Sequence, residues 1–326
     1  MTALLEVNDL AVSFGTADGV VQAVRGVSFE VERGRTLGIV GESGSGKSVA
    51  TQTIVGLTPG AKVDGRAVFE ERELLKLGPE ALRRVRGAEI ALIFQDPLSC
   101  LHPQFRVGWQ IVEAIQAHRD VPKAEARRRT IELLGLVGIP HPASRVDDYP
   151  HQFSGGMRQR AMIAMALALD PKLLIADEPT TALDVTVQAQ IIDLMKELQA
   201  NLGTAIILIT HDLGVLAGIA DDVLVMYAGQ AMERGPRTEV YRRPRHPYTH
   251  GLIGALPSRG KGRLQSIPGL PPSALSPPRG CPFHPRCPFV FDRCREEQPP
   301  LAASDGPAHA AACWLPADDP RLVRPA

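Results

Sequence analysis

Short apolar runs alternate with amphipathic stretches over roughly the first 240 residues. The runs Thr36–Val40, Ile90–Phe94, Leu173–Ala176 and Ala205–Ile209 are each too short for a helix of ordinary length. Continuous apolar runs of this length are typical of strands buried on both faces, as in a parallel sheet. Amphipathic segments between such strands are typical of crossover helices. The pattern therefore predicts an α/β fold.

The amino-acid composition of the sequence changes after Arg243. More than half of the 28 prolines follow this point, and so do four of the five cysteines. Each proline removes a backbone donor and fixes φ, so few regular elements can form there. We expect a boundary near residues 243–246, with one domain over residues 1–243 and an irregular, Pro- and Cys-rich module over residues 244–326.

Composition narrows the class of protein. The 326 residues are 44% apolar and 22% charged, which is typical of a folded globular chain. The formal net charge is zero, which argues against binding nucleic acid by bulk charge. No apolar stretch approaches the roughly 20 residues that span a bilayer. The N-terminus has an acid at Glu6 and no basic region before it, so we expect no signal peptide and a cytoplasmic chain.

The sequence from Gly41 to Ser48 matches the phosphate-binding pattern G-x4-G-K-[ST]. A predicted strand precedes it, and residues 49–55 can continue as a helix. Glycines let the backbone N–H groups surround phosphate oxygens, and the helix N-terminus adds positive charge. Lys47 is expected to reach the β- and γ-phosphates, and the Ser48 hydroxyl to ligate Mg²⁺. A glycine-rich turn that matches by chance is the alternative.

Two acids, Asp177 and Glu178, end a later apolar run. Ligands of parallel sheets gather at the carboxyl ends of the strands. Asp177 is thus placed to complete the Mg²⁺ shell, and Glu178 to orient or deprotonate an attacking water. By itself such a pair could be a turn or a helix cap. Together with the phosphate loop, it predicts a nucleotide-hydrolysing site.

Three further features lie around predicted strand and helix ends. Ser154-Gly155-Gly156 opens a helical stretch and forms either a second anion-binding terminus or a plain N-cap. His211 follows the strand Ala205–Ile209, where an imidazole is either structural or catalytic. Gln95 follows the strand Ile90–Phe94, where its amide can sense Mg²⁺ or the attacking water.

Taken in order, the phosphate loop, Gln95, Ser154-Gly155-Gly156, Asp177-Glu178, Asp184 and His211 resemble the ATP-binding cassette (ABC) ATPases. The resemblance covers residues 1 to about 240. It implies a P-loop NTPase, RecA-like core with an antiparallel β-subdomain and an inserted α-helical subdomain over residues 97–169. It also implies that two ATPase chains pair head to tail, each closing on the ATP of the other.

The resemblance assigns roles to individual residues. Catalytic roles fall to Glu178 as base, His211 as γ-phosphate contact, Gln95 and Lys47, while Mg²⁺ is held at Ser48, Gln95 and Asp177. Phe14 replaces the tyrosine that usually stacks on adenine, and Asp184 lies in the loop that crosses the dimer interface. The implied ATP contacts are Phe14, Gly41, Ser43, Gly44, Ser45, Gly46, Lys47, Ser48, Val49, Gln95, Ser154, Gly155, Gly156, Asp184 and His211.

Within the family the chain is most similar to the oligopeptide and dipeptide importer ATPases. The residues that carry this resemblance are those from Ser154 to Arg160, from Ala176 to Gln190 and from Arg245 to Thr249. Met157 and Thr180-Thr181 resemble the first of two unlike ATPases that pair as a heterodimer. The segment 95–103 differs from the usual form, which ends in Ser-Leu-Asn-Pro. In such ATPases this segment contacts a coupling helix of the membrane subunit.

The resemblance implies a peripheral subunit at the cytoplasmic face of the cell membrane. Its expected partners are a second ABC ATPase, two integral membrane permease subunits and an extracytoplasmic substrate-binding protein, with no nucleic acid. The expected function is ATP hydrolysis that energises uptake of short peptides. Alternatives are the same role for nickel or opines, or a soluble ABC ATPase without a transport partner.

Four cysteines, Cys281, Cys287, Cys294 and Cys313, are spaced C-x5-C-x6-C-x18-C. In a cytoplasmic chain, metal or cluster ligation is favoured over disulfides. Four thiolates suit either tetrahedral Zn²⁺ or a [4Fe–4S] cluster, and unligated thiols are a third reading. Because similar cysteines in the peptide-importer branch accompany a [4Fe–4S] cluster, the resemblance favours the cluster.

Overall fold

The computed structural model describes residues 3–95, 100–181, 183–256, 267–303, 309–317 and 319–322. The chain forms two compact units, which are described separately below. Unit 1 comprises Met1–Glu32, Thr36–Lys76 and Thr210–Ala326, and unit 2 comprises Arg33–Arg35 and Leu77–Ile209.

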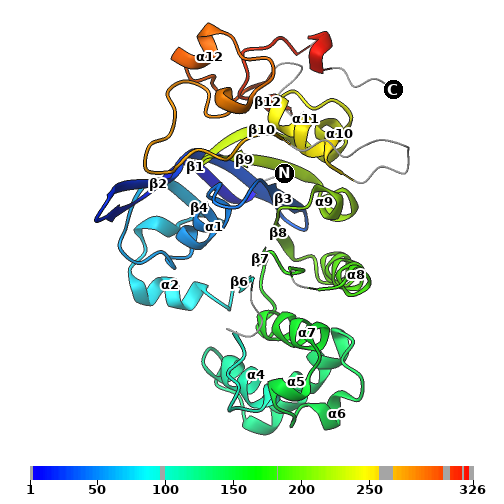
Figure 1. Ribbon diagram of the computed structural model, residues 1–326. Helices are drawn as coiled ribbons and strands as arrows, with labels where there is room; N and C mark the ends of the chain where they lie inside the picture. The colour runs from blue at the N-terminus through cyan, green and yellow to red at the C-terminus, as the bar shows by residue number, and fades with distance from the viewer. Residues whose placement is uncertain are drawn as a thin grey trace. The chain divides into compact units, whose positions relative to one another are not determined.

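Unit 1 contains a four-stranded antiparallel sheet. Its order is β2-β1-β4-β5, and its strands are β1 (Ala3–Thr16), β2 (Gly19–Glu32), β4 (Ala61–Phe69) and β5 (Arg72–Glu73). Along β1, Leu5, Val7, Leu10 and Val12 are buried, as expected of a sheet with one face on a core. The expected antiparallel β-subdomain is thus confirmed (Figure 1).

Unit 1 also holds the strand that leads into the phosphate loop. That strand, β3 (Thr36–Val40), is buried throughout and pairs in parallel with β9 (Asp222–Tyr227), which pairs antiparallel with β10 (Gln230–Pro236). The helices of this part are α1 (Lys47–Ile54), α9 (Leu213–Ile219) and α10 (Arg237–Arg242), and a 3-10 turn covers Leu74–Lys76.

Unit 2 is built on three parallel strands. They are β6 (Ile90–Ile93), β7 (Leu173–Asp177) and β8 (Ala205–Thr210), with Ile93 opposite Ala176 and Asp177 opposite Ile209. The carboxyl ends of the strands therefore meet at one edge. The helices are α2 (Pro79–Val85), α4 (Val107–Gln116), α5 (Lys123–Leu136), α6 (Pro142–Arg145), α7 (Gly155–Ala166) and α8 (Val185–Leu202), and a 3-10 turn covers Pro150–Gln152.

Helices α4, α5 and α7 pack together and form the helical part of unit 2 (Figure 1). Their shared core contains Ile111, Ile115, Leu133, Leu134 and Ile163. The α/β fold and the inserted helical layer are as the sequence predicts. The first residues of the expected helical subdomain, 97–99, lie outside the described residues.

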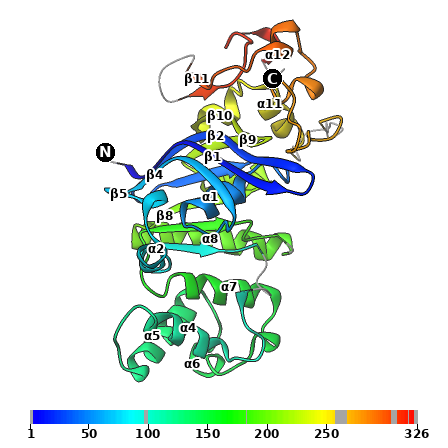
Figure 2. The same cartoon turned by 90° about the vertical axis from the view of Figure 1, so that its left-hand side faces the viewer.

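The C-terminal part of unit 1 has little regular structure, as the prolines predict. Its elements are α11 (Pro247–Gly254), α12 (Asp292–Glu296), β11 (Ala302–Ala303), β12 (Ala310–Ala311) and two 3-10 turns at His284–Arg286 and Pro320–Leu322. Strand β12 pairs with β10, so this part is attached to a sheet of the same unit (Figure 2). A domain boundary at residue 243 stays a prediction, since both sides of it belong to unit 1.

Across the described parts of the chain, no helix has both the length and the apolar character needed to cross a membrane.

Candidate functional site

The phosphate loop of unit 1 connects β3 to α1. The Lys47 ammonium is 5% exposed and donates to the carbonyl oxygens of Gly41 and Glu42, at 2.8 and 2.9 Å. The ammonium is therefore held by carbonyl groups of the loop itself. Ser45 is also buried, while Ser48 is partly exposed in the first turn of α1.

Two glycines of the loop are required by packing. A Cβ atom at Gly41 would lie 2.1 Å from the carbonyl oxygen of Met226, and one at Gly46 would lie 2.3 Å from that of Ala23. Gly46 also has φ of 96°, which side chains disfavour. The loop is thus packed closely against β9 and β2.

Unit 2 brings Gln95 and Glu178 together. Gln95 follows β6, Glu178 follows β7, and the Gln95 amide donates to Glu178 Oε2 at 3.2 Å. The Thr181 hydroxyl donates to the same oxygen at 2.8 Å. Both donors hold the Glu178 side chain in place at the end of β7.

Glu178 adopts an uncommon backbone conformation. Its φ is +46°, in the left-handed region that non-glycine residues rarely occupy. Its N–H donates to the carbonyl of Ile209 at 2.9 Å, which continues the parallel ladder between β7 and β8 for one residue. Such backbone strain is common at functional sites.

The other predicted site residues belong to one unit or the other. Asp177 is the last residue of β7 in unit 2 and is 7% exposed, and His211 directly follows β8 and belongs to unit 1. Phe14 lies on β1, opposite Val21 on β2 and Ala61 on β4. The phosphate loop, Phe14 and His211 are thus in unit 1, whereas Gln95, Asp177 and Glu178 are in unit 2.

Ser154 and Asp184 are N-caps of unit 2. Ser154 Oγ accepts from the N–H of Met157 at 3.3 Å and opens α7, and Asp184 Oδ1 accepts from Val187 at 2.9 Å and opens α8. Ser154, Gly155 and Asp184 are exposed, so the bare N-terminus of α7 faces solvent. Ser154 is therefore an N-cap, one of the two alternatives expected for it. The exposed terminus can still be reached by an anion.

The four late cysteines line one small cavity of about 20 Å³. Burial raises the pKa of Cys281 to about 12 and that of Cys313 to about 11, and the neighbouring thiols add to both shifts. A bound cation is what would make such buried thiols thiolates, so the donor set fits a metal group. Within the described residues, however, no three metal-ligating side chains already lie close enough to hold an ion.

The two nearby histidines are engaged elsewhere. A ring nitrogen of His284 lies 2.9 Å from the carbonyl oxygen of Cys281, and His309 Nε2 lies 2.8 Å from Glu233 Oε1. His284 and His246 also line the cavity beside the thiols, and His246 Nε2 is buried there without a hydrogen-bond partner.

Sequence reasoning missed two residues at these sites. In the sequence, Thr181 is informative only through the resemblance to peptide-importer ATPases, although its hydroxyl donates to Glu178. Arg286 was not singled out, yet its guanidinium binds the carboxylate of Glu42 in the phosphate loop, 244 positions away, at 2.7 and 3.0 Å. The position of Thr181, three residues after Glu178, was a usable signal, whereas nothing in the sequence pairs Arg286 with Glu42.

Comparison with known proteins agrees with this arrangement. The family described as "ABC transporter" matches residues 24–181, and the "Oligopeptide/dipeptide transporter, C-terminal region" matches residues 232–294. The chain is 52% identical to the oligopeptide transport ATP-binding protein OppD of Bacillus subtilis, covering 100% of this chain and 92% of that protein. It is 50% identical to the dipeptide transport ATP-binding protein DppD of Escherichia coli, covering 97% and 98%.

A solved structure shows the same fold. The dimeric bacterial ABC transporter cassette MJ0796 superposes with a TM-score of 0.64 at 25% identity, over 72% of this chain and 98% of that one. Identity near 50% along the whole chain shows more than the fold. The chain is therefore an ATPase of the ABC family and belongs to the group of oligopeptide and dipeptide transport ATP-binding proteins.

Proposed function

We propose that this chain hydrolyses ATP to energise the import of short peptides, with Glu178 as the catalytic base. The observation that carries the catalytic assignment is the hydrogen-bonded carboxylate at the end of β7. Two neutral donors orient it, and neither competes with it for the proton of water. Lys47 in unit 1 is proposed to hold the β- and γ-phosphates.

The remaining nucleotide contacts follow from the same assignment. Phe14 would stack on adenine, since its ring offers a π-face without the usual hydroxyl. Mg²⁺ would be held by Ser48, Gln95 and Asp177, and His211 would contact the γ-phosphate. These groups would stabilise the charge that develops on the transferred phosphoryl group.

We also propose a head-to-tail dimer with a second, related ATPase. Ser154 and Asp184 are exposed at helix N-termini of unit 2, and Val185 beside Asp184 is 83% exposed. An exposed apolar side chain next to a solvent-facing helix terminus suits a surface that another chain covers. MJ0796 is described as dimeric. A heterodimer is proposed on the resemblance carried by Met157 and Thr180-Thr181.

A membrane partner is proposed to dock on unit 2. An apolar cavity of about 550 Å³ is lined by residues from β6, α4 and α7, among them Leu92, Phe94, Met162 and Met165. Met side chains adapt to an apolar partner, and the cavity suits an amphipathic helix. The segment 96–99, part of the expected coupling region, lies outside the described residues. The proposed location is the cytoplasmic face of the cell membrane.

Short peptides are proposed as the solute because the relatives named above transport oligopeptides or dipeptides. The two permease subunits and the extracytoplasmic binding protein would select the solute. Nickel and opines are therefore the alternatives within the same ATPase role.

A [4Fe–4S] cluster is proposed at the four cysteines, with Zn²⁺ as the alternative. Its support is the donor set, four thiols, one of them on α12, that line one cavity. When bound, the group would cross-link segments that bury little core of their own. Metal and acid-labile sulfide analysis of anaerobically purified full chain tests this. About four irons and four sulfides, lost in Cys287→Ser, would support the cluster, while one zinc without sulfide would support the alternative.

Uptake of labelled di- and tripeptides tests the function. The chain would be co-expressed with its membrane partners in vesicles, and Glu178→Gln would serve as the inactive control. ATP-dependent accumulation with the wild-type chain and none with Glu178→Gln would support the proposal. Accumulation of nickel or an opine instead of peptide would overturn the solute assignment and leave the ATPase assignment standing.

A further inference from the structure

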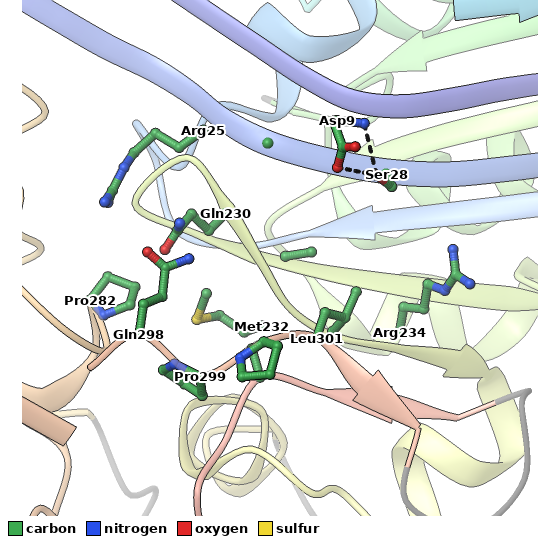
Figure 3. A pocket seen from close by; sticks show the side chains of 14 residues that line it. Asp9, Arg25, Ser28, Gln230, Met232, Arg234, Pro282, Gln298, Pro299 and Leu301 are labelled. Carbon is green, nitrogen blue, oxygen red and sulfur yellow. Dashed lines mark hydrogen bonds between the residues drawn. The ribbon is translucent and has the colours of Figure 1, made fainter. Parts of the chain in front are cut away.

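A cavity of about 360 Å³ in unit 1 lies apart from the phosphate loop (Figure 3). Strands β1 and β2 form one side, β10 forms another, and residues 298–301 of the C-terminal part close it. No residue of the phosphate loop and none of the four cysteines lines it. The cavity therefore belongs to neither site described above.

Arg25 is a half-buried cation on this cavity. Its Nη1 is buried without a hydrogen-bond partner, and no ion pair to it is found among the described residues. Burial lowers the pKa of Arg25, which is the direction expected when nothing compensates the charge. A buried guanidinium without an anion is costly, so an anion beside it would be stabilising.

Polar groups without partners accompany Arg25. Gln230 on β10 is 6% exposed, and its Oε1 is buried without a partner. In Figure 3 the amides of Gln230 and Gln298 lie toward the same end of the pocket as Arg25, with Met232 in the middle. A primary amide offers either its oxygen or its nitrogen by rotating about its last bond, so both side chains can donate to an anion.

We propose that this pocket binds a small anion, through a carboxylate or phosphate group held by Arg25 and the amides of Gln230 and Gln298. The bidentate fork of arginine fits either group. Because residues of both β10 and the C-terminal part line the pocket, a bound anion would connect the two through its contacts.

Thermal unfolding of the full chain tests the pocket. MgADP is kept saturating so that the phosphate loop is filled. Inorganic phosphate or glutarate is then added at 10 mM. This concentration is chosen for the test and is roughly 100 times a Kd of 0.1 mM. We expect one of the two anions to raise the Tm by about 3 °C or more, and the rise to be lost in Arg25→Gln. A rise in Tm with phosphate would identify a phosphate group as the ligand, and a rise with glutarate would identify a carboxylate group.

Arg83→Gln is the matched control, because Arg83 is 74% exposed, forms an ion pair with Glu80 nearby on α2, and does not line the cavity. It should keep the full shift. Equal shifts in wild type, Arg25→Gln and Arg83→Gln would show a general salt effect and overturn the proposal. So would the absence of a shift with either anion.

A separate observation concerns Arg286, which is 6% exposed and lies in the 3-10 turn between Cys281 and Cys287. All five N–H groups of its guanidinium have acceptors. Two go to the Glu42 carboxylate at 2.7 and 3.0 Å, one to the Tyr227 hydroxyl at 3.2 Å, and two to the carbonyls of Pro268 and Ile267 at 2.9 and 3.4 Å. Such complete pairing fixes the side chain.

Glu42 is thereby held from two sides. Its carboxylate receives Arg286, and its backbone N–H donates to the Tyr248 hydroxyl at 2.9 Å, while its carbonyl receives Lys47 at 2.9 Å. One residue of the phosphate loop thus connects the lysine that meets phosphate with the segment that carries two of the four cysteines.

We infer that Arg286 is a positioning residue for ATP: it fixes Glu42, and with it the loop, in the shape that binds phosphate. The inference rests on the proposed ATP site. It also means that disturbing the cysteine site would reach the nucleotide through Arg286.

MgATP titration of the full chain, followed by calorimetry, tests this at a temperature where each variant is folded by circular dichroism. We expect Arg286→Ala and Glu42→Ala each to raise the Kd about tenfold, and the double variant to raise it no further, because both remove one interaction. Arg293→Ala removes an ion pair of 2.8 Å to Glu297 in the same C-terminal part and should leave the Kd unchanged.

Three outcomes would contradict either the positioning role of Arg286 or the ATP site itself. If Arg286→Ala binds MgATP like wild type while Lys47→Ala does not bind, the positioning role is wrong and the ATP site stands. If Lys47→Ala binds MgATP like wild type, the proposed ATP site itself is wrong. Independent, additive effects of the two single variants would also overturn the positioning role.

Discussion

Thr181 and Gln95 both donate to the same oxygen of Glu178, so these two hydrogen bonds contribute to the positioning of the proposed base. A hydrogen bond to a charged group is worth about 1.5–3 kcal/mol. The shorter bond comes from Thr181, at 2.8 Å. Losing it should free the carboxylate to rotate away from water, with little effect on how ATP is bound.

Thr181→Val is therefore expected to lower kcat by about tenfold or more while leaving the KM for ATP within about twofold. Steady-state ATPase assays of the assembled transporter measure both. Thr181→Ser keeps the hydroxyl and should retain most activity. Full activity in Thr181→Val together with a loss in Thr181→Ser would mean that the γ-methyl packing matters and the hydrogen bond does not.

Glu178→Gln removes the base without changing the size of the side chain. Turnover should fall by at least about 100-fold, and the Kd for MgATP should stay within about threefold, because general base catalysis contributes only in the transition state. Single-turnover hydrolysis and equilibrium binding separate the two effects. A variant that hydrolysed ATP at the wild-type rate would exclude Glu178 as the base.

At the scale of elements, α7 and α8 depend on their first residues. Each begins with a side-chain cap, Ser154 for α7 and Asp184 for α8, and the helices approach closely there. A Cβ atom at Gly156 would lie 2.8 Å from Val187 Cγ1, so glycine is what lets α7 meet α8. The glycines of the Ser-Gly-Gly motif thus have a packing role in addition to the anion-binding role proposed for them.

Asp184→Ala should lower the free energy of unfolding by about 1 kcal/mol, because the N–H of Val187 loses its acceptor. Asp184→Asn keeps the amide oxygen as a cap and should cost a few tenths of that. Denaturant unfolding monitored by circular dichroism measures both changes. Similar losses in the two variants would show that the negative charge stabilises the start of α8, and that the cap does not.

At the scale of the whole molecule, His246 connects β10 to the C-terminal part of unit 1. The imidazole is 1% exposed and caps α11, because its Nδ1 accepts from the N–H of Tyr248 at 3.1 Å. The backbone N–H of His246 donates to the buried Glu233 carboxylate at 2.9 Å. Burial lowers the pKa of His246 to about 3, so the ring stays neutral in the folded state.

The pH dependence of stability follows from that shift. Below the ordinary pKa of 6.5 the unfolded chain binds a proton at His246 that the folded chain does not, until the pH reaches about 3. Stability should thus fall with acidity over this window, by up to about 1.4 kcal/mol per pH unit from this group. Chemical unfolding of wild type and His246→Asn at pH 5 and 7 tests it. Asn keeps a capping acceptor without titrating, so an equally steep pH dependence in that variant would contradict the assignment.

Much of the fold and of the proposed ATP site was predictable because the signals are local. The phosphate loop, Asp177-Glu178 and Ser154-Gly155-Gly156 are contiguous motifs placed by the strand or helix that each adjoins, and a strand end fixes where the next residue lies. The antiparallel sheet and the family were expected from resemblance, and the structure and the comparisons confirm them.

The sequence by itself determined the α/β class, the phosphate loop and the order of the ATPase motifs, because backbone geometry and short-range chemistry specify them. Only the tertiary structure decided that Arg286 binds Glu42 across 244 positions, that the four cysteines line one cavity, and that Arg25 is half-buried without an ion-pair partner in the described chain. Such pairings depend on how distant segments pack. No local pattern encodes which buried charge meets a partner and which is left for a ligand.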